Sequence, residues 1–284
     1  MRRFGAAVFT AVVIAFVSVT ALAQAPGQAP QRKLIKITDN LYRFQNNFHF
    51  GVVYVTPAGV IVGDTIDTAA ATWLKDEIAR QFNQPVKYVF LSHDHDDHAS
   101  GAEVFANTGA VVISHALARA KIAANRPPAA VPTVTFTDRL DINLGGKTVE
   151  LHFVGKNHSD NMIVARFPAE RVVFAVDWIP VKGLAFREMH DSYFPDWNDG
   201  LKRVEAMDFD TLTPGHGNVG TKADVAAFRG YLEDLQAAVR KAMSEGKSVD
   251  QMKAEIKLDK YKDWQQYGQF LALNVQGMHG YLAK

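Results

Sequence analysis

Apolar positions along the chain follow two periodicities, which together predict a mixture of strands and helices. Short apolar or alternating runs predict strands at 34–44, 51–55, 60–63, 86–91, 110–114, 134–136, 149–154, 162–167, 171–176 and 211–213. Helical spacing predicts helices at 68–82, 101–106, 116–124 and 197–207, and helical structure from 221 to the end. Turn residues separate the runs, as at Thr56-Pro57-Ala58-Gly59 within a hairpin and at the Gly145-Gly146 pair, which turns the chain between 134–136 and 149–154. Because strands come in groups and also alternate with helices, we expect stacked sheets with helices on the outside.

The N-terminus has the pattern of a secretory signal peptide over residues 1–23. Two arginines supply a positive start, residues 4–22 are almost wholly apolar, and Ala21-Leu22-Ala23 has the small-x-small form after which signal peptidase cleaves. A membrane anchor is the alternative, because an apolar run of this length is close to the spanning limit. Residues 24–33, rich in Gln, Ala and Pro, predict a flexible tether. We therefore expect a periplasmic or secreted protein with a folded domain over 34–284 and no membrane contact after cleavage.

The charge and cysteine content narrow the classes of partner and ligand. The chain carries 31 basic and 30 acidic residues, and loss of the two arginines of the signal leaves 29 basic against 30 acidic residues. This balance favours a small-molecule substrate over nucleic acid or an anionic membrane. The chain has no cysteine, so it forms no disulfide and any metal site must use nitrogen and oxygen ligands.

The most informative segment is Ser92-His93-Asp94-His95-Asp96-Asp97-His98, which directly follows the apolar run at 86–91. A solvated polar turn is the ordinary explanation of such a segment. Here, however, the residues have the order His-x-His-x-Asp-His, in which His93 and His95 point the same way from an extended chain. Asp97 and His98 then turn toward a second point as a helix begins. Imidazole nitrogens and a carboxylate in this arrangement predict a zinc site.

Three later residues support this interpretation because each follows a predicted strand. His158 comes after the strand at 149–154, Asp177 directly after the strand at 171–176, and His216 after the strand at 211–213. Taken singly, each would be interpreted as an ordinary loop or capping residue. Their shared position at strand ends, where ligands gather in open sheets, predicts that they converge with the 92–98 segment.

In order and spacing these motifs resemble those of the metallo-β-lactamase superfamily, over residues 39–220. Asp64, in Val62-Gly63-Asp64-Thr65, matches the first characteristic aspartate of the family, and the 92–98 segment matches its signature. The resemblance implies an α/β fold: an αββα sandwich of two mixed β-sheets flanked by helices.

The resemblance also implies a role for each matched residue. His93, His95 and His158 would bind one zinc ion, Asp97, His98 and His216 a second, and Asp177 would bridge the two. Asp64 would orient a ligand or the signature loop by hydrogen bonds. A hydroxide bridging the metals would attack the substrate, with Asp97 orienting it.

Two positions indicate the branch of the family. His95 stands where the oxygen-reducing diiron members generally carry Glu, which favours the hydrolytic zinc type. Asp177 stands where true β-lactamases usually carry Cys or Ser, which is more similar to glyoxalase-II-type thioesterases and lactonases. We therefore expect an exported two-zinc hydrolase that cleaves a lactam, lactone, ester or thioester. The alternatives are a mononuclear iron dioxygenase acting on persulfides and a non-catalytic metal-binding or partner-binding module on the same scaffold.

Substrate contacts are expected from two further segments. Tyr193 lies between Asp177 and His216 in sequence and is a candidate donor to an oxyanion, with simple packing as the alternative. Residues 48–50 are a candidate apolar flap over the metals, with stabilisation of the hairpin as the alternative.

Overall fold

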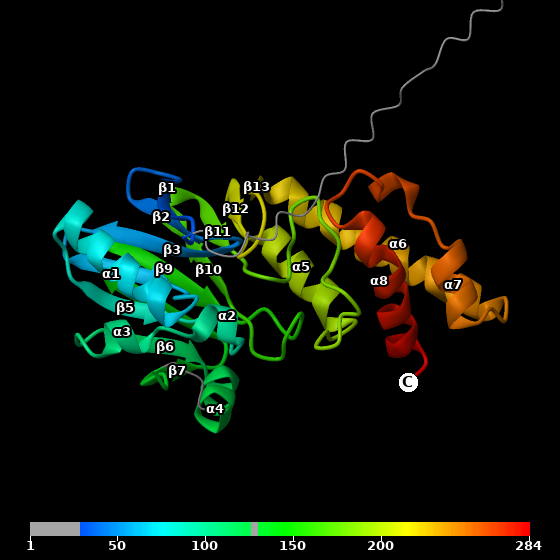
Figure 1. Cartoon of the computed structure of the whole chain (residues 1–284), viewed down its shortest axis with the longest axis horizontal. Coiled ribbons are helices and arrows are strands. Elements are labelled where there is room, and N and C mark those ends of the chain that lie inside the picture. The colour runs from blue at the N-terminus through cyan, green and yellow to red at the C-terminus, as the bar shows by residue number, and fades with distance from the viewer. Residues whose placement is uncertain (1–28, 126–129) are drawn as a thin grey trace, which may run out of the picture. The chain divides into compact units, whose positions relative to one another are not determined.

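Two β-sheets form the centre of the structure, a computed structural model that describes residues 29–125 and 130–284 (Figure 1). The first sheet contains, in spatial order, β1 (Arg32–Lys36), β2 (Leu41–Asn46), β3 (His49–Thr56), β4 (Gly59–Gly63), β5 (Val86–Phe90), β6 (Val111–His115) and β7 (Val134–Phe136). The second contains β13 (Gly220–Thr221), β12 (Thr211–Thr213), β11 (Val172–Phe174), β10 (Val164–Phe167), β9 (Lys147–His152) and β8 (Arg139–Leu144). The predicted signal peptide and residues 24–28 of the predicted tether lie outside the described residues.

Both sheets are mixed, as expected. In the first, β1 to β4 pair antiparallel, and β4 to β7 pair parallel. In the second, only β11 and β12 pair parallel. The parallel pairs matter for function because strands that run the same way deliver their carboxyl ends, and the loops that follow, to one edge of the sandwich.

Helices cover both outer faces of the sandwich. They are α1 (Thr68–Phe82), α2 (Asp96–Ala99), α3 (Glu103–Ala106), α4 (Ala116–Asn125), α5 (Asp196–Ala206), α6 (Lys222–Ser244), α7 (Val249–Glu255) and α8 (Tyr267–Leu282), with 3-10 turns at Pro168–Glu170 and Asp259–Tyr261. The buried face of α1, which includes Leu74 and Ile78, packs on the first sheet, as its spacing predicts. No helix of the described segments is long and apolar enough to cross a membrane.

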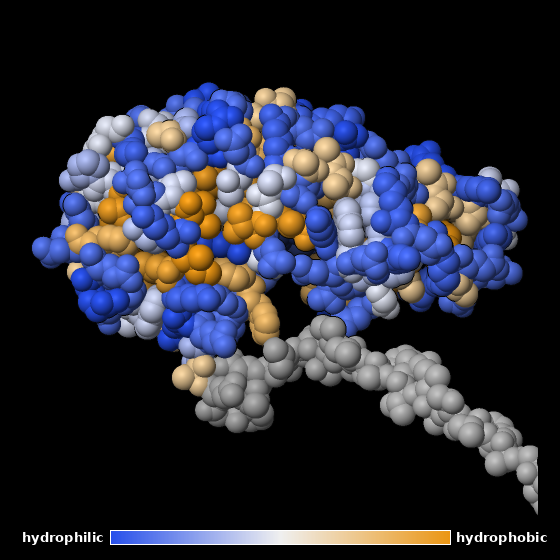
Figure 2. All heavy atoms as spheres, turned by 90° about the horizontal axis from the view of Figure 1, so that it is seen from above, coloured by the Kyte–Doolittle hydropathy of each residue, from blue (hydrophilic) through white to orange (hydrophobic). Residues whose placement is uncertain are grey.

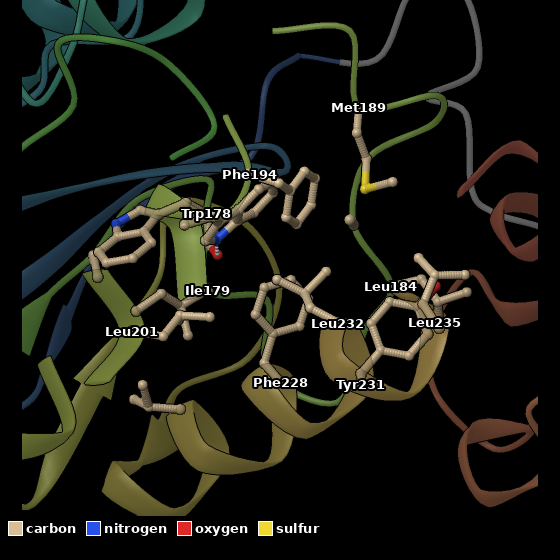
Figure 3. Packing of buried hydrophobic residues seen from close by; sticks show 14 of the residues in the cluster. Trp178, Ile179, Leu184, Met189, Phe194, Leu201, Phe228, Tyr231, Leu232 and Leu235 are labelled. Carbon is tan, nitrogen blue, oxygen red and sulfur yellow. Dashed lines mark hydrogen bonds between the residues drawn. The ribbon is translucent and has the colours of Figure 1, made fainter. Parts of the chain in front are cut away.

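Three groups of buried apolar residues hold these layers together. One lies between the sheets and includes Tyr54 of β3 and Phe167 of β10, whose ring centroids are 5.1 Å apart. The largest lies between the second sheet and the C-terminal helices, where Trp178 and Leu201 are near Phe228 of α6 (Figure 3). Burial of this area at roughly 25 cal/mol per Å² is the main stabilising contribution, since the chain has no disulfide.

The strand prediction at 34–44 is wrong in one respect, because two strands occupy this stretch. The chain turns at Thr38, where the backbone N–H groups of Ile37 and Thr38 both donate to Leu41 O, at 2.9 and 3.0 Å. The Thr38-Asp39-Asn40 sequence is typical of such a turn.

The prediction also missed β8, although Leu140, Ile142 and Leu144 alternate with polar residues there. The Gly145-Gly146 pair, which was expected between the strands at 134–136 and 149–154, instead turns the chain from β8 to β9.

The C-terminal helices α6 to α8 form a further packed layer beside the sandwich. α6 packs against both α5 and α8, and α7 packs against α8 (Figure 1). α6 and α7 each begin with a capping box, formed by Thr221 with Asp224 and by Ser248 with Gln251. The face drawn in Figure 2 is mainly hydrophilic, with hydrophobic residues gathered in its left half. The chain from α6 to its end is therefore mainly helical, as its sequence predicts.

Candidate metal centre

The seven residues predicted as ligands converge at one edge of the sandwich. They form two groups, whose nitrogen and oxygen atoms lie within 4.8 Å of one another inside each group: His93, His95, His158 and Asp177, and Asp97, His98, Asp177 and His216. The 93–98 segment follows β5 and enters α2, and the other three residues follow β9, β11 and β12. The convergence therefore arises from strand ends, as the sequence indicates.

Asp177 is the residue that the two groups share. Its Oδ1 lies 3.2 Å from both His98 Nε2 and His216 Nε2. Its Oδ2 lies 3.6 Å from His93 Nε2 and 3.9 Å from His158 Nε2. One carboxylate oxygen thus faces each group, which is the geometry of a ligand that bridges two cations.

Two buried atoms at the centre have no well-directed hydrogen bond among the described residues: His93 Nε2 and Asp177 Oδ1. Buried polar atoms without a partner are costly, so natural proteins rarely retain them without a function. Because each of these atoms lies within 4.8 Å of the other donor atoms of its group, the observation fits two bound metal ions. The donor set of imidazole nitrogens and carboxylate oxygens suits zinc.

Asp64 orients this centre from beneath, as predicted. Its side chain is fully buried and accepts hydrogen bonds from the Ser92 backbone N–H and hydroxyl, both at 2.7 Å. Its Oδ2 also lies 3.2 Å from His98 Nδ1, and Ser92 Oγ lies 2.9 Å from His93 Nδ1. One carboxylate therefore fixes an imidazole of each group through the nitrogen that faces away from the metal position.

Burial and charge divide four histidines of the centre into two classes, one with lowered and one with raised pKa. Burial lowers the pKa of His93 well below its usual value, and burial likewise lowers the pKa of His158. For His98 burial acts in the same direction, but the carboxylates of Asp177 and Asp64 outweigh it and raise its pKa well above the usual value. The pKa of His216 is also raised, because Asp177 outweighs burial. The second group therefore attracts protons that a metal must displace.

The loop that carries His216 is held by two hydrogen bonds from the first sheet. Arg43, which is buried, donates from Nη2 to Pro214 O at 2.6 Å. The Phe50 backbone N–H donates to Gly215 O at 2.8 Å. Gly215 is required here, since a Cβ at this position would lie 2.3 Å from Val176 Cγ1.

His49 is a site residue that the sequence analysis named only as part of a candidate apolar flap, without its contact to Asp97. Its Nε2 lies 3.2 Å from Asp97 Oδ2, and its ring meets that of His216 edge to face at 4.8 Å. The expectation of an apolar flap over 48–50 is wrong for two of its three members. The polar ring of His49 faces Asp97, and Phe50 is buried beneath Arg43, which leaves only Phe48 exposed. The sequence feature that could have indicated this role is a single histidine at the start of a mainly apolar strand.

Burial of Asp97 would by itself raise its pKa. The hydrogen bond from His49 and the charges of His98 and His216 outweigh burial and lower the pKa of Asp97 to about 2. Its carboxylate is therefore ionised throughout the physiological range, as a metal ligand must be. A cavity of about 640 Å³ opens beside His49 and Asp97 and is also lined by Asn46, Asp67 and Asp96, so it reaches Asp97 of the second group.

Tyr193 lies beside the first group. Its backbone N–H donates to Asn157 O at 2.9 Å, next to His158, and Lys156 Nζ lies 5.1 Å from its ring centroid. The Tyr193 hydroxyl has no hydrogen-bond partner among the described residues, so its role as a donor to substrate stays a prediction. Asp191, which the sequence analysis did not single out, places a carboxylate oxygen 3.9 Å from His95 Nε2.

The loop before Asp191 is fixed by the last helix. Asn274 of α8 is fully buried and donates from Nδ2 to Ala185 O at 2.9 Å and to Arg187 O at 2.6 Å. The Tyr231 hydroxyl of α6 donates to Asn274 Oδ1 at 2.5 Å. The C-terminal helices thus set the position of the segment that borders the first group.

Comparison with known proteins agrees with this geometry. Residues 56–216 match the family model described as the metallo-beta-lactamase superfamily. The chain is 25% identical over 234 residues to the 2,4-dinitroanisole O-demethylase subunit alpha of Nocardioides sp. (strain JS1661), covering 76% of this chain and 71% of that protein. It is 26% identical over 196 residues to a metallo-beta-lactamase type 2 of Elizabethkingia meningoseptica, covering 63% of this chain and 75% of that protein.

Solved structures show the same fold. A metallo-beta-lactamase from Pontibacter korlensis superposes with a TM-score of 0.66 at 22% identity, over 72% of this chain and 99% of that one. The superposition accounts for almost all of the other protein but leaves more than a quarter of this chain unmatched.

Proposed function

Because the chain belongs to the metallo-β-lactamase superfamily, we propose that it is an exported hydrolase that holds two zinc ions and cleaves an acyl bond of a small molecule. The observation that carries the proposal is the position of Asp177, with one carboxylate oxygen toward each group of ligands. When bound, two divalent ions that share a bridging ligand supply an activated water and Lewis-acid polarisation of a carbonyl oxygen. No side-chain nucleophile is required.

The residues of the chain divide the remaining work. Asp97, ionised and held by His49, orients the attacking water through a hydrogen bond. Tyr193 donates its hydroxyl proton in a hydrogen bond to the oxyanion, at the side of the first group. Asp64 keeps His98 in the tautomer that presents Nε2 to the metal position.

The substrate class follows from the ligand set and the relatives. An aspartate at 177 is more similar to thioesterases and lactonases of the family than to true β-lactamases. Two relatives carry different names, one an O-demethylase subunit and the other a β-lactamase, so substrates of the family members vary widely. We therefore place lactones, esters and thioesters ahead of β-lactams as substrates.

The proposal of export rests on the signal-like pattern of residues 1–23. N-terminal sequencing of the protein recovered from a periplasmic extract would show a start at Gln24. A start at Met1 in a membrane fraction would favour the anchor instead.

The experiment that tests the proposed function combines metal analysis with a substrate panel. The mature, zinc-loaded protein would be assayed with acyl lactones, glutathione thioesters, simple esters, cephalosporins and 2,4-dinitroanisole. We expect turnover of an acyl substrate, and loss of both turnover and one equivalent of zinc in His93→Ala and in His98→Ala. Full activity with unchanged zinc in these variants would contradict the mechanism.

Two other outcomes correspond to the alternatives. One equivalent of iron, together with oxygen uptake on a persulfide, would identify the mononuclear dioxygenase. Two bound metals without turnover of any substrate in the panel would favour a non-catalytic binding module.

A further inference from the structure

Three consecutive residues, Phe48 and the first two of β3, contact the second group of candidate ligands or the loop that carries His216. Phe48 O accepts a hydrogen bond from His216 Nδ1 at 3.0 Å, and Phe50 N–H donates to Gly215 O at 2.8 Å. Between them, His49 reaches Asp97 at 3.2 Å. One strand end therefore contacts the two loops that carry Asp97 and His216.

The start of β3 is itself firmly placed. His49 pairs with Asn46 of β2, and the strand approaches the end of β4 so closely that a Cβ on Gly51 would lie 2.5 Å from the backbone oxygens of Gly63 and Asp64. Because β3 is held by a strand on each side, the backbone position from which the His49 side chain extends is fixed. The ring is about one-third exposed, and its contact with His216 further restricts its rotation.

Asp97, by contrast, depends on its neighbours for orientation. Its side chain is 47% exposed and belongs to α2, a helix of four residues. Its other close neighbours are His98 Nε2 at 3.6 Å and His216 Nε2 at 3.9 Å, and both nitrogens are themselves candidate metal ligands. His49 is therefore the contact of Asp97 that stays available when a metal occupies the second position.

We propose that His49 is a positioning residue that fixes the Asp97 carboxylate and thereby sets the affinity of the second metal position. The inference rests on the proposed two-metal function and assigns His49 a supporting role beside the seven candidate ligands. His49 acts through Asp97, since the second group of converging donor atoms comprises Asp97, His98, Asp177 and His216 without it. Nε2–H donates to Asp97 Oδ2, the oxygen that also faces His98 and His216, and the second lone pair of that oxygen stays available to a metal. Removal of such an orienting partner typically weakens metal binding about 10–100-fold.

The test uses His49→Ala and His49→Gln in the full mature protein. Zinc would be titrated against a chromophoric chelator to obtain a dissociation constant for each of the two equivalents. The electronic spectrum of the cobalt-substituted protein would report ligand geometry independently of activity. Urea unfolding of the metal-free variants would show that each folds. His190→Ala is the matched control, because its side chain is 79% exposed and, within the part of the chain that the structure describes, its ring has no polar contact besides that with Glu188.

We expect His49→Ala to bind the first equivalent with wild-type affinity and the second about 10–100-fold more weakly, with an altered cobalt spectrum. His49→Gln retains an N–H donor and should recover most of the second-site affinity. Wild-type affinity for both equivalents in His49→Ala would overturn the inference and leave the proposed function intact. A wild-type protein that binds only one equivalent would overturn the proposed function and the inference together.

Discussion

Gly215→Ala should disturb the second metal position, because it adds a methyl group where the structure has no room for one. The added Cβ would lie 2.3 Å from Val176 Cγ1 and 3.0 Å from both Asp177 Oδ1 and His98 Cε1. Ordinary contacts are about 3.5–4.0 Å, so the backbone or its neighbours must move by roughly 1.2 Å. The loop cannot retreat freely, because Gly215 N–H donates to Val176 O and Phe50 N–H donates to Gly215 O.

Overpacking of this kind costs about 1–3 kcal/mol of the free energy of unfolding. A displacement of about 1 Å in the reacting groups can also lower the rate about 100-fold. The assay is urea unfolding of the metal-free protein, followed by zinc content and the rate on the best substrate. Gly268→Ala in α8 is the control, because no atom lies within 4 Å of its added Cβ, and it should be neutral or stabilising by up to about 1 kcal/mol. A Gly215→Ala protein with wild-type stability, two zinc ions and full activity would refute the steric argument.

Three further predictions concern the metal centre and the residues that hold it in place. Asp64→Asn should destabilise the protein by about 2–5 kcal/mol and weaken zinc binding, because the buried hydrogen bonds to Ser92 and His98 lose their carboxylate. Urea unfolding and zinc titration measure these effects, and unchanged results would count against the orienting role of Asp64. The raised pKa of His98 means that it holds a proton below that pKa, so zinc binding near pH 7 should release protons and weaken as the pH falls, whereas His93, with its lowered pKa, releases none. Calorimetry in buffers of different ionisation enthalpy measures this release, and identical apparent enthalpies would contradict it. Asn274→Asp should lower the free energy of unfolding in urea by about 1–3 kcal/mol, since it removes the amide N–H groups that donate to Ala185 O and Arg187 O. It should also speed the hydrogen exchange of the backbone at 185–187. Unchanged exchange there would show that the loop does not depend on α8.

The candidate ligands were predictable because each has a local signal. His158, Asp177 and His216 each come within six residues after an apolar strand, and strands that run the same way bring their carboxyl ends to the same edge. Asp64 was predictable for a different reason, since only its place in a matched motif suggested hydrogen bonds to the ligands. The structure shows those bonds and the sharing of Asp177, which no spacing rule alone provides.

The supporting residues were not predictable, because their contacts depend on register and packing. His49 is one position in an alternating strand, and a shift of one residue would turn its ring to the other face of the sheet. Asn274 occupies the buried face of α8, where periodicity favours an apolar residue. Its partners are backbone carbonyls of a distant loop, and backbone atoms carry no sequence signal.

The central claim is that two metal ions sit on either side of Asp177, and anomalous diffraction from crystals of the zinc-loaded protein, recorded at the zinc absorption edge, tests it most directly. The account predicts two anomalous peaks per chain about 3.5–4 Å apart, one beside each carboxylate oxygen of Asp177. A single peak, or two peaks that do not share Asp177, would contradict it.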